Sequence, residues 1–421
     1  MKRMAVAGFA ALVMGFGAIT FAVPGNAAAQ SSDVAGQIII KFRDTGAAAG
    51  ALRQHGLGEG AGIGSTGAHL IKVPAGKESQ LIAALSQNPA VEYAEPDQLV
   101  TVASDDEYFD RQYALHNTGQ SFPNTSGTVT VAGGENDADI DAVEAWSITT
   151  GDGIKVAILD TGVASDHPDI GPKVVARANF STAATGEDKY GHGTHVAGIV
   201  AASADNTIGV AGVCPACTIL DGKVLDDSGS GSTSHVAAGI YWAVSNGAKV
   251  INMSLGQRLP SRTLETAVNY AWKNGVVIVA AAGNAGTEDR IYPGAYRNVI
   301  AVAATDNTDA KAFFSTYGAK WVDVAAPGVD VYSTFPTGSF VIGEPPDGRS
   351  PGYDIASGTS MASPVVAGVA ALAWSSQTRA TNRSVRAAVE STADEIDGTG
   401  TFWEHGRVNA CNAVGGDCPL R

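Results

Sequence analysis

The sequence predicts an α/β protein in which a parallel sheet lies between helices, preceded by a smaller α+β domain. Between about residues 140 and 411, short apolar runs alternate with segments of helical periodicity. Continuous apolar strands that alternate with helices are typical of a parallel sheet covered on both faces. The composition agrees with this class, because 45% of the 421 residues are hydrophobic and 16% are charged. Such a balance favours a large packed core over disorder.

The elements of the larger domain follow from these patterns. Strands are expected at residues 155–159, 218–224, 250–253, 276–281, 299–303 and 321–324. Helices are expected at residues 195–203, 234–245, 263–273 and 361–374. Active sites of parallel sheets gather at the carboxyl ends of the strands. Polar residues directly after these strands are therefore the first candidates for chemistry.

A smaller domain is expected from about residue 31 to residue 103. Strands are expected at residues 37–42 and 69–73 and around 91–93, with a helix at 77–86. Leu81, Ile82 and Leu85 fall on one face of that helix, as an amphipathic helix requires. Residues 104–139, which follow, are polar and irregular and predict a connecting region.

The first 29 residues predict a secretory signal peptide. Met1, Lys2 and Arg3 form a basic start, an apolar stretch runs to about Val23, and small residues lead to a cleavage site after Ala29. The alternative is a retained membrane anchor, because the apolar stretch could almost span a bilayer. The small residues favour cleavage. We therefore expect a secreted protein, extracellular or periplasmic, with no membrane attachment after cleavage.

The net charge narrows the classes of partner. The formal net charge is -15 at pH 7, whereas nucleic acids and anionic membranes require basic surfaces. The sequence therefore predicts no nucleic-acid partner.

The four cysteines are Cys214, Cys217, Cys411 and Cys418. An even number in an oxidising compartment favours disulfides, and the short spacings suggest the pairs 214–217 and 411–418, although the sequence leaves connectivity open. The first pair could also be a redox motif. A zinc site of four cysteines is disfavoured by the long gap within the second pair.

Three segments carry residue types suited to nucleophilic catalysis. Asp160 ends an apolar strand, His192 begins a helix of small residues, and Ser360 lies between a turn and a helix. A serine hydroxyl needs a base to become a nucleophile, and histidine is the natural base near neutral pH. A buried carboxylate would orient the imidazole and stabilise its charged form. We expect Pro364 to lie in the first turn of the helix, where a missing N–H costs little.

In the order Asp, His, Ser, these segments resemble the subtilisin-like serine proteases, a family with that chain order. The resemblance covers about residues 106–409 and implies a subtilisin-like three-layer fold. It implies that Ser360 attacks the scissile carbonyl, His192 transfers the proton and Asp160 orients His192. His195, three residues after His192, is expected to be structural. No catalytic cofactor is expected.

The resemblance also implies residues that bind the substrate. Residues 280–284 resemble the segment of the oxyanion hole, with the Asn284 side chain and the Ser360 backbone N–H as its donors. Two segments would hold the substrate as an added strand, and they comprise Gly229, Ser230, Gly231, Ser254, Leu255 and Gly256. The S1 pocket is expected between the second of these segments and Ala281, Ala282 and Gly283. Ile291 would fill its base and favour small or medium apolar P1 side chains.

Residues 204–210 resemble a calcium loop of the same family. The implied ligands are the side chains of Asp106, Asp169 and Asn206 and the carbonyls of Ala204, Ile208 and Val210. Such an oxygen shell suits a hard cation. The alternative is a surface turn that holds sodium or water.

The smaller domain resembles the inhibitory propeptide of the family, a ferredoxin-like domain that assists folding and then blocks the active site. Self-cleavage is expected near Ala103, before Asp105 and Asp106. The implied organisation is a signal peptide at 1–29, a propeptide at 30–103 and a catalytic domain at 104–421. Protein substrates and its own propeptide are the expected partners of a monomeric enzyme.

Two other functions remain open. A metallohydrolase could use His192 and His195, which are three residues apart, but no His-Glu-x-x-His pattern supports it. A catalytically silent binding protein could share the fold. The presence of Asp160, His192, Ser360 and Asn284 together argues against it.

Overall fold

The computed structural model describes residues 33–43, 50, 52–58, 60–64, 66–74, 76–98 and 104–418. The chain divides into two compact units, one ending at Thr101 and the other beginning at Val102. The expected signal peptide and the expected cleavage region around Ala103 lie outside the described residues. Among the residues described, no helix is both long and apolar enough to cross a membrane.

The N-terminal unit is a small α+β domain, as predicted. Its antiparallel sheet has the strand order β2-β3-β1-β4. The elements are β1 (Asp33–Phe42), β2 (Ala61–Gly62), β3 (Ala68–Lys72), α2 (Glu78–Leu85) and β4 (Val91–Gln98). Ile38, Ile71 and Leu85 are fully buried in its core. The strand expected at 91–93 extends further because it pairs with β1 along most of its length.

The C-terminal unit is built on a seven-stranded parallel sheet with the order β13-β12-β11-β10-β7-β9-β8. The strands are β7 (Lys155–Asp160), β8 (Val174–Asn179), β9 (Thr218–Lys223), β10 (Val250–Met253), β11 (Val277–Ala281), β12 (Ile300–Thr305) and β13 (Val324–Pro327). The parallel sheet predicted from the apolar runs is confirmed.

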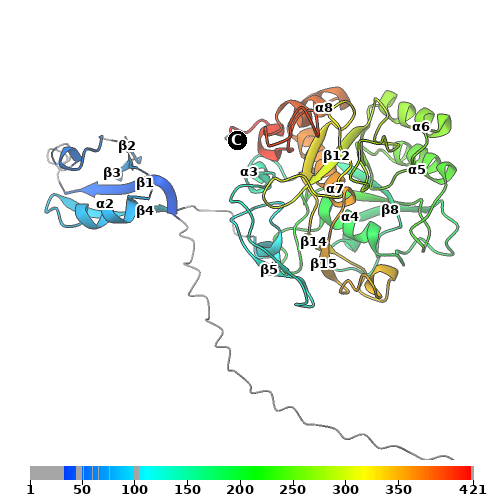
Figure 1. Ribbon diagram of the computed structural model, residues 1–421, viewed down its shortest axis with the longest axis horizontal. Coiled ribbons are helices and arrows are strands. Elements are labelled where there is room, and N and C mark those ends of the chain that lie inside the picture. The colour runs from blue at the N-terminus through cyan, green and yellow to red at the C-terminus, as the bar shows by residue number, and fades with distance from the viewer. Residues whose placement is uncertain are drawn as a thin grey trace, which may run out of the picture. The chain divides into compact units, whose positions relative to one another are not determined.

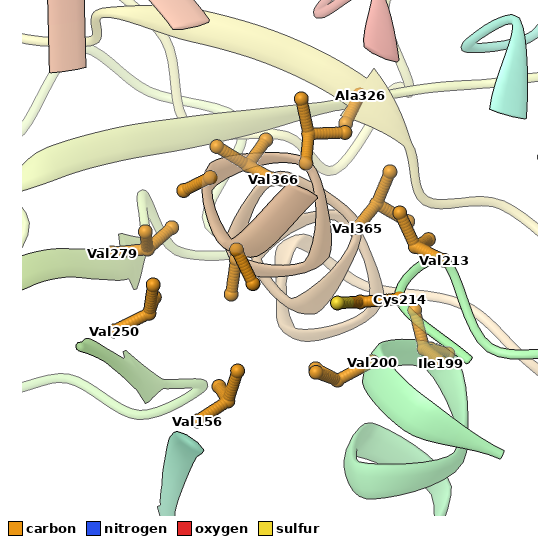
Figure 2. Packing of buried hydrophobic residues seen from close by; sticks show 14 of the residues in the cluster. Val156, Ile199, Val200, Val213, Cys214, Val250, Val279, Ala326, Val365 and Val366 are labelled. Carbon is orange, nitrogen blue, oxygen red and sulfur yellow. The ribbon is translucent and has the colours of Figure 1, made fainter. Parts of the chain in front are cut away.

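Helices cover both faces of this sheet (Figure 1). Helices α4 (His192–Ala201) and α7 (Thr359–Ser376) cover one face, and α5 (Thr233–Ser245) and α6 (Arg262–Lys273) cover the other. The side chains of alternate strand residues belong to different cores. Val156 lies in the core around α7 (Figure 2), whereas Ala157 lies in the core beneath α5 and α6. Because both faces are buried at the centre of the sheet, strands such as β10 and β11 consist almost entirely of apolar residues.

The remaining elements connect or flank the layers. They are η1 (Phe109–Arg111), β5 (Phe122–Pro123), β6 (Thr130–Val131), α3 (Ala142–Trp146), η2 (Gly171–Lys173), β14 (Val331–Thr334), η3 (Val341–Gly343), β15 (Tyr353–Ala356), α8 (Asn382–Ser391) and α9 (Ala410–Ala413).

Within the seven-stranded sheet, two strands differ most from the prediction. The sequence pattern misses β8 because this edge strand alternates half-buried and exposed residues instead of forming an apolar run. The strand expected at 321–324 begins only at Val324. Trp321 and Val322 instead donate their backbone N–H groups to the Gly318 carbonyl in a turn.

Both suggested disulfides form, joining Cys214 to Cys217 and Cys411 to Cys418. No free cysteine remains in the described part of the chain. Cys214 and Cys217 are fully buried beside α7, where they belong to the same core as Val365 and Val366 (Figure 2).

Candidate active site

Asp160 and His192 come together at the carboxyl end of β7. Asp160 is the last residue of the strand and His192 the first residue of α4. His192 Nδ1 lies 2.7 Å from Asp160 Oδ1, and the Thr161 N–H donates to the same oxygen. Burial lowers the pKa of His192, but the charge and hydrogen bond of Asp160, with the charge of Asp188, outweigh burial and raise it overall. When Nδ1 donates to Asp160, Nε2 is the nitrogen that can accept a proton.

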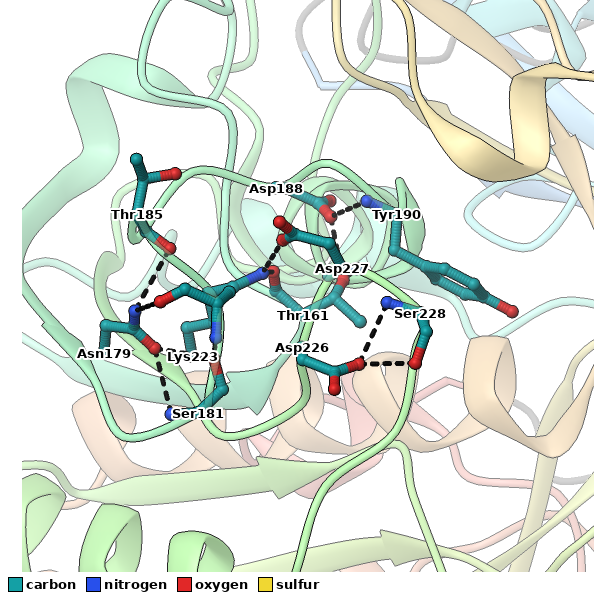
Figure 3. A network of polar contacts seen from close by, with 12 residues as sticks. Thr161, Asn179, Ser181, Thr185, Asp188, Tyr190, Lys223, Asp226, Asp227 and Ser228 are labelled. Atoms are coloured by element: carbon teal, nitrogen blue, oxygen red, sulfur yellow. Dashed lines mark hydrogen bonds and ion pairs between the residues drawn. The ribbon is translucent and has the colours of Figure 1, made fainter.

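Asp188 holds the start of α4 in place (Figure 3). Its buried carboxylate accepts hydrogen bonds from the backbone N–H groups of Tyr190, Gly191 and Thr194 and from the hydroxyls of Thr161 and Thr194. The Thr161 hydroxyl in turn accepts from the Gly193 N–H. Asp188 therefore ties the turn after Asp160 to the helix that begins with His192. The sequence analysis missed this residue.

Lys223, at the end of β9, contacts the same turn after Asp160. Its side chain is fully buried, and its ammonium group donates to the Thr161 carbonyl at 2.5 Å and pairs with Asp227 at 2.9 Å (Figure 3). A buried ammonium group is costly unless it is paired and hydrogen-bonded. These contacts satisfy Lys223 and fix the backbone beside Asp160.

Ser360 is the second residue of α7 and contacts Ser254 through two hydrogen bonds. The Ser360 hydroxyl donates to the Ser254 carbonyl at 3.3 Å, and the Ser254 hydroxyl donates to the Ser360 carbonyl at 2.8 Å. Between the two described residues Ser360 and His192, no hydrogen bond is formed in this conformation. Such catalytic contacts often tighten only when substrate binds.

The structure corrects the predicted position of Pro364. Because α7 begins at Thr359, Pro364 lies beyond the first turn, inside the helix. A proline there removes the N–H that would bond the carbonyl four residues earlier, which is that of Ser360. The Ser254 hydroxyl supplies the missing hydrogen bond. Pro364 thus frees the Ser360 carbonyl to connect α7 to the end of β10.

Asn284 lies beside Ser360 in a fixed orientation. Its Oδ1 accepts hydrogen bonds from the backbone N–H (2.9 Å) and the hydroxyl (3.0 Å) of Thr359. The Thr359 hydroxyl also accepts from the Gly283 N–H at 3.0 Å. With Oδ1 held in this way, the Nδ2 group is the free end of the amide and can donate to a substrate oxygen. Thr359 is a second site residue that the sequence analysis missed.

His192, Asn284 and Ser360 line one cavity. The residues expected to hold an extended substrate line a neighbouring groove together with His192, and they are Gly229, Ser230, Gly231, Ser254, Leu255 and Gly256. Asp226 shapes this groove by accepting hydrogen bonds from Ser228 (Figure 3) and from the Ser230 N–H. These bonds lower the pKa of Asp226 to about 2.

A third cavity contains the residues expected to form the S1 pocket. Ala281, Gly283, Asn284, Ile291 and Ser360 are among the residues that line it. Ala282 is not among them, because its side chain is buried in a hydrophobic cluster with Trp403.

Ile291 occupies the space between the two walls of this cavity. A Cβ atom at Gly256 would lie 2.4 Å from Ile291 Cγ2, and one at Gly283 would lie 2.9 Å from Ile291 Cγ1. Both walls therefore need glycine to accommodate the side chain, which narrows the cavity.

The expected calcium ligands gather around residues 204–210. The buried carboxylate of Asp106 accepts hydrogen bonds from the backbone N–H groups of Asp205 and Asn206, and that of Asp169 accepts from the Asn206 side chain and the Val210 N–H. Burial, together with the charge of Asp106, raises the pKa of Asp169 to about 6. Two buried carboxylates from distant segments that meet at one loop fit a cation. The described residues contain no cluster of three or more His, Cys, Asp or Glu that could hold a metal. Of the implied ligands, only Asp106 and Asp169 are carboxylates; the others are an amide and carbonyls.

His195 lies one turn further along α4 than His192. Its side chain is fully buried against Phe335, with ring centroids 4.6 Å apart. Burial above all lowers its pKa to about 3. This environment keeps the imidazole neutral and suits a packing role.

The comparisons with known proteins agree with the fold. Residues 151–410 match the model of the subtilase family, and residues 22–97 match the fervidolysin N-terminal prodomain. Thermitase from Thermoactinomyces vulgaris is 52% identical over 276 residues, which cover 65% of this chain and 93% of thermitase. The thermophilic serine proteinase of Bacillus sp. (strain AK1) is 44% identical over 344 residues, covering 80% of this chain and 76% of that protein.

A solved structure supports the same assignment. A protease from Pseudoalteromonas arctica superposes with a TM-score of 0.63 and 31% identity, covering 74% of this chain and 99% of its own. Fold and relatives together define a serine endopeptidase with an N-terminal prodomain. The chain belongs to the subtilase family.

Proposed function

We propose that this chain is the self-processing precursor of a secreted endopeptidase that works through an acyl-enzyme on Ser360. One observation carries the proposal: Asp160 and His192 share a 2.7 Å contact, and His192 lines the same cavity as Ser360 and Asn284. This arrangement supports Ser360 as the nucleophile, His192 as the base and Asp160 as the orienting acid of a serine protease.

In the proposed mechanism, His192 Nε2 accepts the Ser360 proton as Ser360 Oγ attacks the scissile carbonyl. Asp160 stabilises the resulting imidazolium. Asn284 Nδ2 and the Ser360 N–H donate to the oxyanion of the tetrahedral intermediate. His192 then protonates the leaving amine, and water hydrolyses the acyl-enzyme by the same proton transfers in reverse order.

A serine-directed reagent tests this function. Phenylmethylsulfonyl fluoride is expected to abolish casein hydrolysis and to add its sulfonyl group to Ser360, located by peptide mass spectrometry. A His192→Ala variant should remain unlabelled, because the serine then lacks its base. A metallohydrolase would be spared by the reagent and inhibited by a chelator. A silent binding protein would show neither labelling nor hydrolysis.

The processing proposal rests on the prodomain match at residues 22–97. We place the signal peptide at 1–29, the inhibitory propeptide at 30–103 and the catalytic domain at 104–421. Export through the signal peptide would deliver a broad-specificity enzyme to the extracellular medium or the periplasm. The propeptide would act as a folding aid and inhibitor of a monomeric enzyme.

Substrate preference at P1 is expected to depend on Ile291. The wild-type enzyme should prefer small or medium apolar side chains, because Ile291 fills the space between Gly256 and Gly283. Replacing Ile291 by alanine should raise kcat/KM for Phe relative to Ala at P1 by about tenfold or more. Peptide libraries with a fixed leaving group provide the measurement.

Leu259→Ala is a matched control, since Leu259 is an apolar residue that is 76% exposed. This variant should keep the wild-type profile. A wild-type profile dominated by Phe and Tyr would contradict the role of Ile291.

We further propose that Asp106, Asp169 and Asn206, with the carbonyls of Ala204, Ile208 and Val210, bind a structural calcium ion. Chelation should then lower Tm, because the cation binds only the folded state and offsets the repulsion of two buried carboxylates. A loss of about 5–10 °C is expected if the site is saturated beforehand.

Calorimetry of the Ser360→Ala protein measures this effect without autolysis. Adding excess calcium to the chelated sample should restore Tm, whereas excess magnesium should not. An unchanged Tm after chelation would show that the loop is an ordinary surface turn.

A further inference from the structure

The loop between β14 and β15, residues 335–352, is attached to the start of α4. The N–H groups of Val341 and Ile342 donate to the carbonyls of Lys189 and Tyr190 at 2.9 and 3.1 Å. The Phe340 ring lies so close to Gly191 that a Cβ atom there would be 2.4 Å from it. The loop is therefore fixed directly beside His192.

This loop supplies one wall of the cavity that contains His192, Asn284 and Ser360. Its contributions are Phe335, Ile342, Asp347 and Arg349. Of the residues that line this cavity, only Asn284 and Ser360 also line the S1 cavity. Since the scissile carbonyl must lie at these two residues, the P1 side chain and the leaving group enter different cavities. The leaving amine must reach His192, which lines the cavity with Arg349 and the groove of Gly229 and Ser254 but not the S1 cavity. Because that groove is assigned to the extended substrate before the scissile bond, the leaving group is expected in the cavity with Arg349.

Arg349 brings a positive charge to this leaving-group cavity. The residue is half-buried, and its N–H donates to the Ile342 carbonyl at 3.1 Å, which closes the loop. Among the residues that the structure describes, no carboxylate lies within ion-pair distance of its guanidinium. After burial and the charge of His192, Arg349 is one of the groups that lower the pKa of His195. The charge of Arg349 therefore acts on a residue of α4, the helix that begins with His192.

Asp347 carries the opposite charge in the same cavity. It is exposed, whereas Arg349 is half-buried. An exposed charge is screened more strongly by water and salt than a partly buried one. Guanidinium also matches a carboxylate with two parallel hydrogen bonds. The charge of Arg349 therefore outweighs that of Asp347, and the cavity favours an acidic group on the ligand.

We propose that Arg349 is a specificity-determining residue that selects an acidic side chain at the first or second residue after the scissile bond. This inference rests on the proposed acyl-enzyme mechanism. The chain's own sequence has the matching chemistry, because Asp105 and Asp106 follow the expected processing site near Ala103.

Acyl transfer to an added amine measures the preference for the residues after the scissile bond separately from the preference at P1. The acyl-enzyme is formed from a peptide ester and then partitions between water and an added dipeptide amide. In transfer, the amine nitrogen attacks the acyl carbon, the C–O bond to Ser360 breaks, and His192 passes the amine proton to Ser360 Oγ. Asp-Gly-amide, Asn-Gly-amide, Gly-Asp-amide and Gly-Asn-amide serve as nucleophiles, so each acid is compared with its isosteric amide at the same position.

The processed wild-type enzyme is expected to prefer Asp over Asn by about two- to fivefold at one of the two positions, the range of a partly exposed ion pair. Arg349→Gln should abolish this preference, Arg349→Lys should retain part of it, and Asp347→Asn should increase it. Arg379→Gln removes an exposed arginine beyond the far end of α7 and should leave the preference unchanged.

Ester hydrolysis separates failure of this inference from failure of the proposed function. If the ester is not cleaved, the acyl-enzyme mechanism itself is wrong. If it is cleaved but Asp and Asn partition equally in the wild-type enzyme, or if Arg349→Gln and Arg349→Lys keep the full preference, Arg349 does not select the leaving group. A preference that weakens equally in Arg379→Gln would also overturn the inference.

Discussion

The Ser360→Ala variant of the full precursor is expected to remain unprocessed and to hydrolyse casein about 10⁶-fold more slowly than the wild-type enzyme, a magnitude that comes from subtilisin. Alanine removes the only atom that can form the acyl-enzyme. It leaves α7 intact, because the Ser360 carbonyl still accepts from Ser254 and the N–H groups keep their places. The same loss should prevent cleavage near Ala103.

Intact mass and casein assays of both precursors make the comparison. The wild type should lose residues 30 to about 103 in addition to its signal peptide, and its new N-terminus would report the preferred P1 residue. Circular dichroism should show the same fold for both proteins. If the folded wild type also stays unprocessed and inactive, the catalytic arrangement is not working and a silent binding protein becomes the leading hypothesis.

The sheet and the reactive residues could be predicted because their sequence signals are local. Strands β7, β10 and β11 are buried on both faces and therefore appear as apolar runs. Asp160 stands directly at the end of one such run. The edge strand β8 lacks this signal because one of its faces is exposed.

The contacts that hold the reactive residues could not be predicted, because they join distant segments. Ser254 and Ser360 are 106 positions apart, and Asn284 and Thr359 are 75 apart. Asp188 lies in a polar segment without periodicity, so nothing in the sequence distinguishes it from a surface acid. Only the three-dimensional structure shows that Asp188 is buried and accepts hydrogen bonds from the start of α4.

The Asp160→Asn variant is expected to lose about 10⁴-fold in turnover near neutral pH. The carboxylate accepts the Nδ1 proton of His192 at 2.7 Å. An asparagine can instead present its NH₂ group to Nδ1, which places the imidazole proton on Nε2. That tautomer cannot accept the proton of Ser360, and the imidazolium that forms in the transition state loses its counter-charge.

The pH dependence of the same variant provides an independent test. His192 must be neutral to act as a base, so activity falls as the pH drops through its pKa. Burial lowers this pKa, but Asp160 contributes the largest opposing effect and the net shift in the wild type is upward from 6.5. Removing the charge of Asp160 should therefore lower the pKa of His192 and move the acidic limb of the kcat profile to lower pH.

Ester hydrolysis measured from pH 4 to 9 would show both effects. Asp166→Asn is the matched control, because Asp166 is an exposed acid that bonds only to Thr337 among the contacts described for its side chain. Its turnover and acidic limb should match the wild type. If Asp160→Asn keeps more than a tenth of the wild-type turnover, Asp160 does not orient His192 for catalysis. If the acidic limb does not move, the charge of Asp160 does not raise the pKa of His192. The catalytic arrangement would then need another acid, and the buried Asp188, whose charge also raises the pKa of His192, would be the candidate.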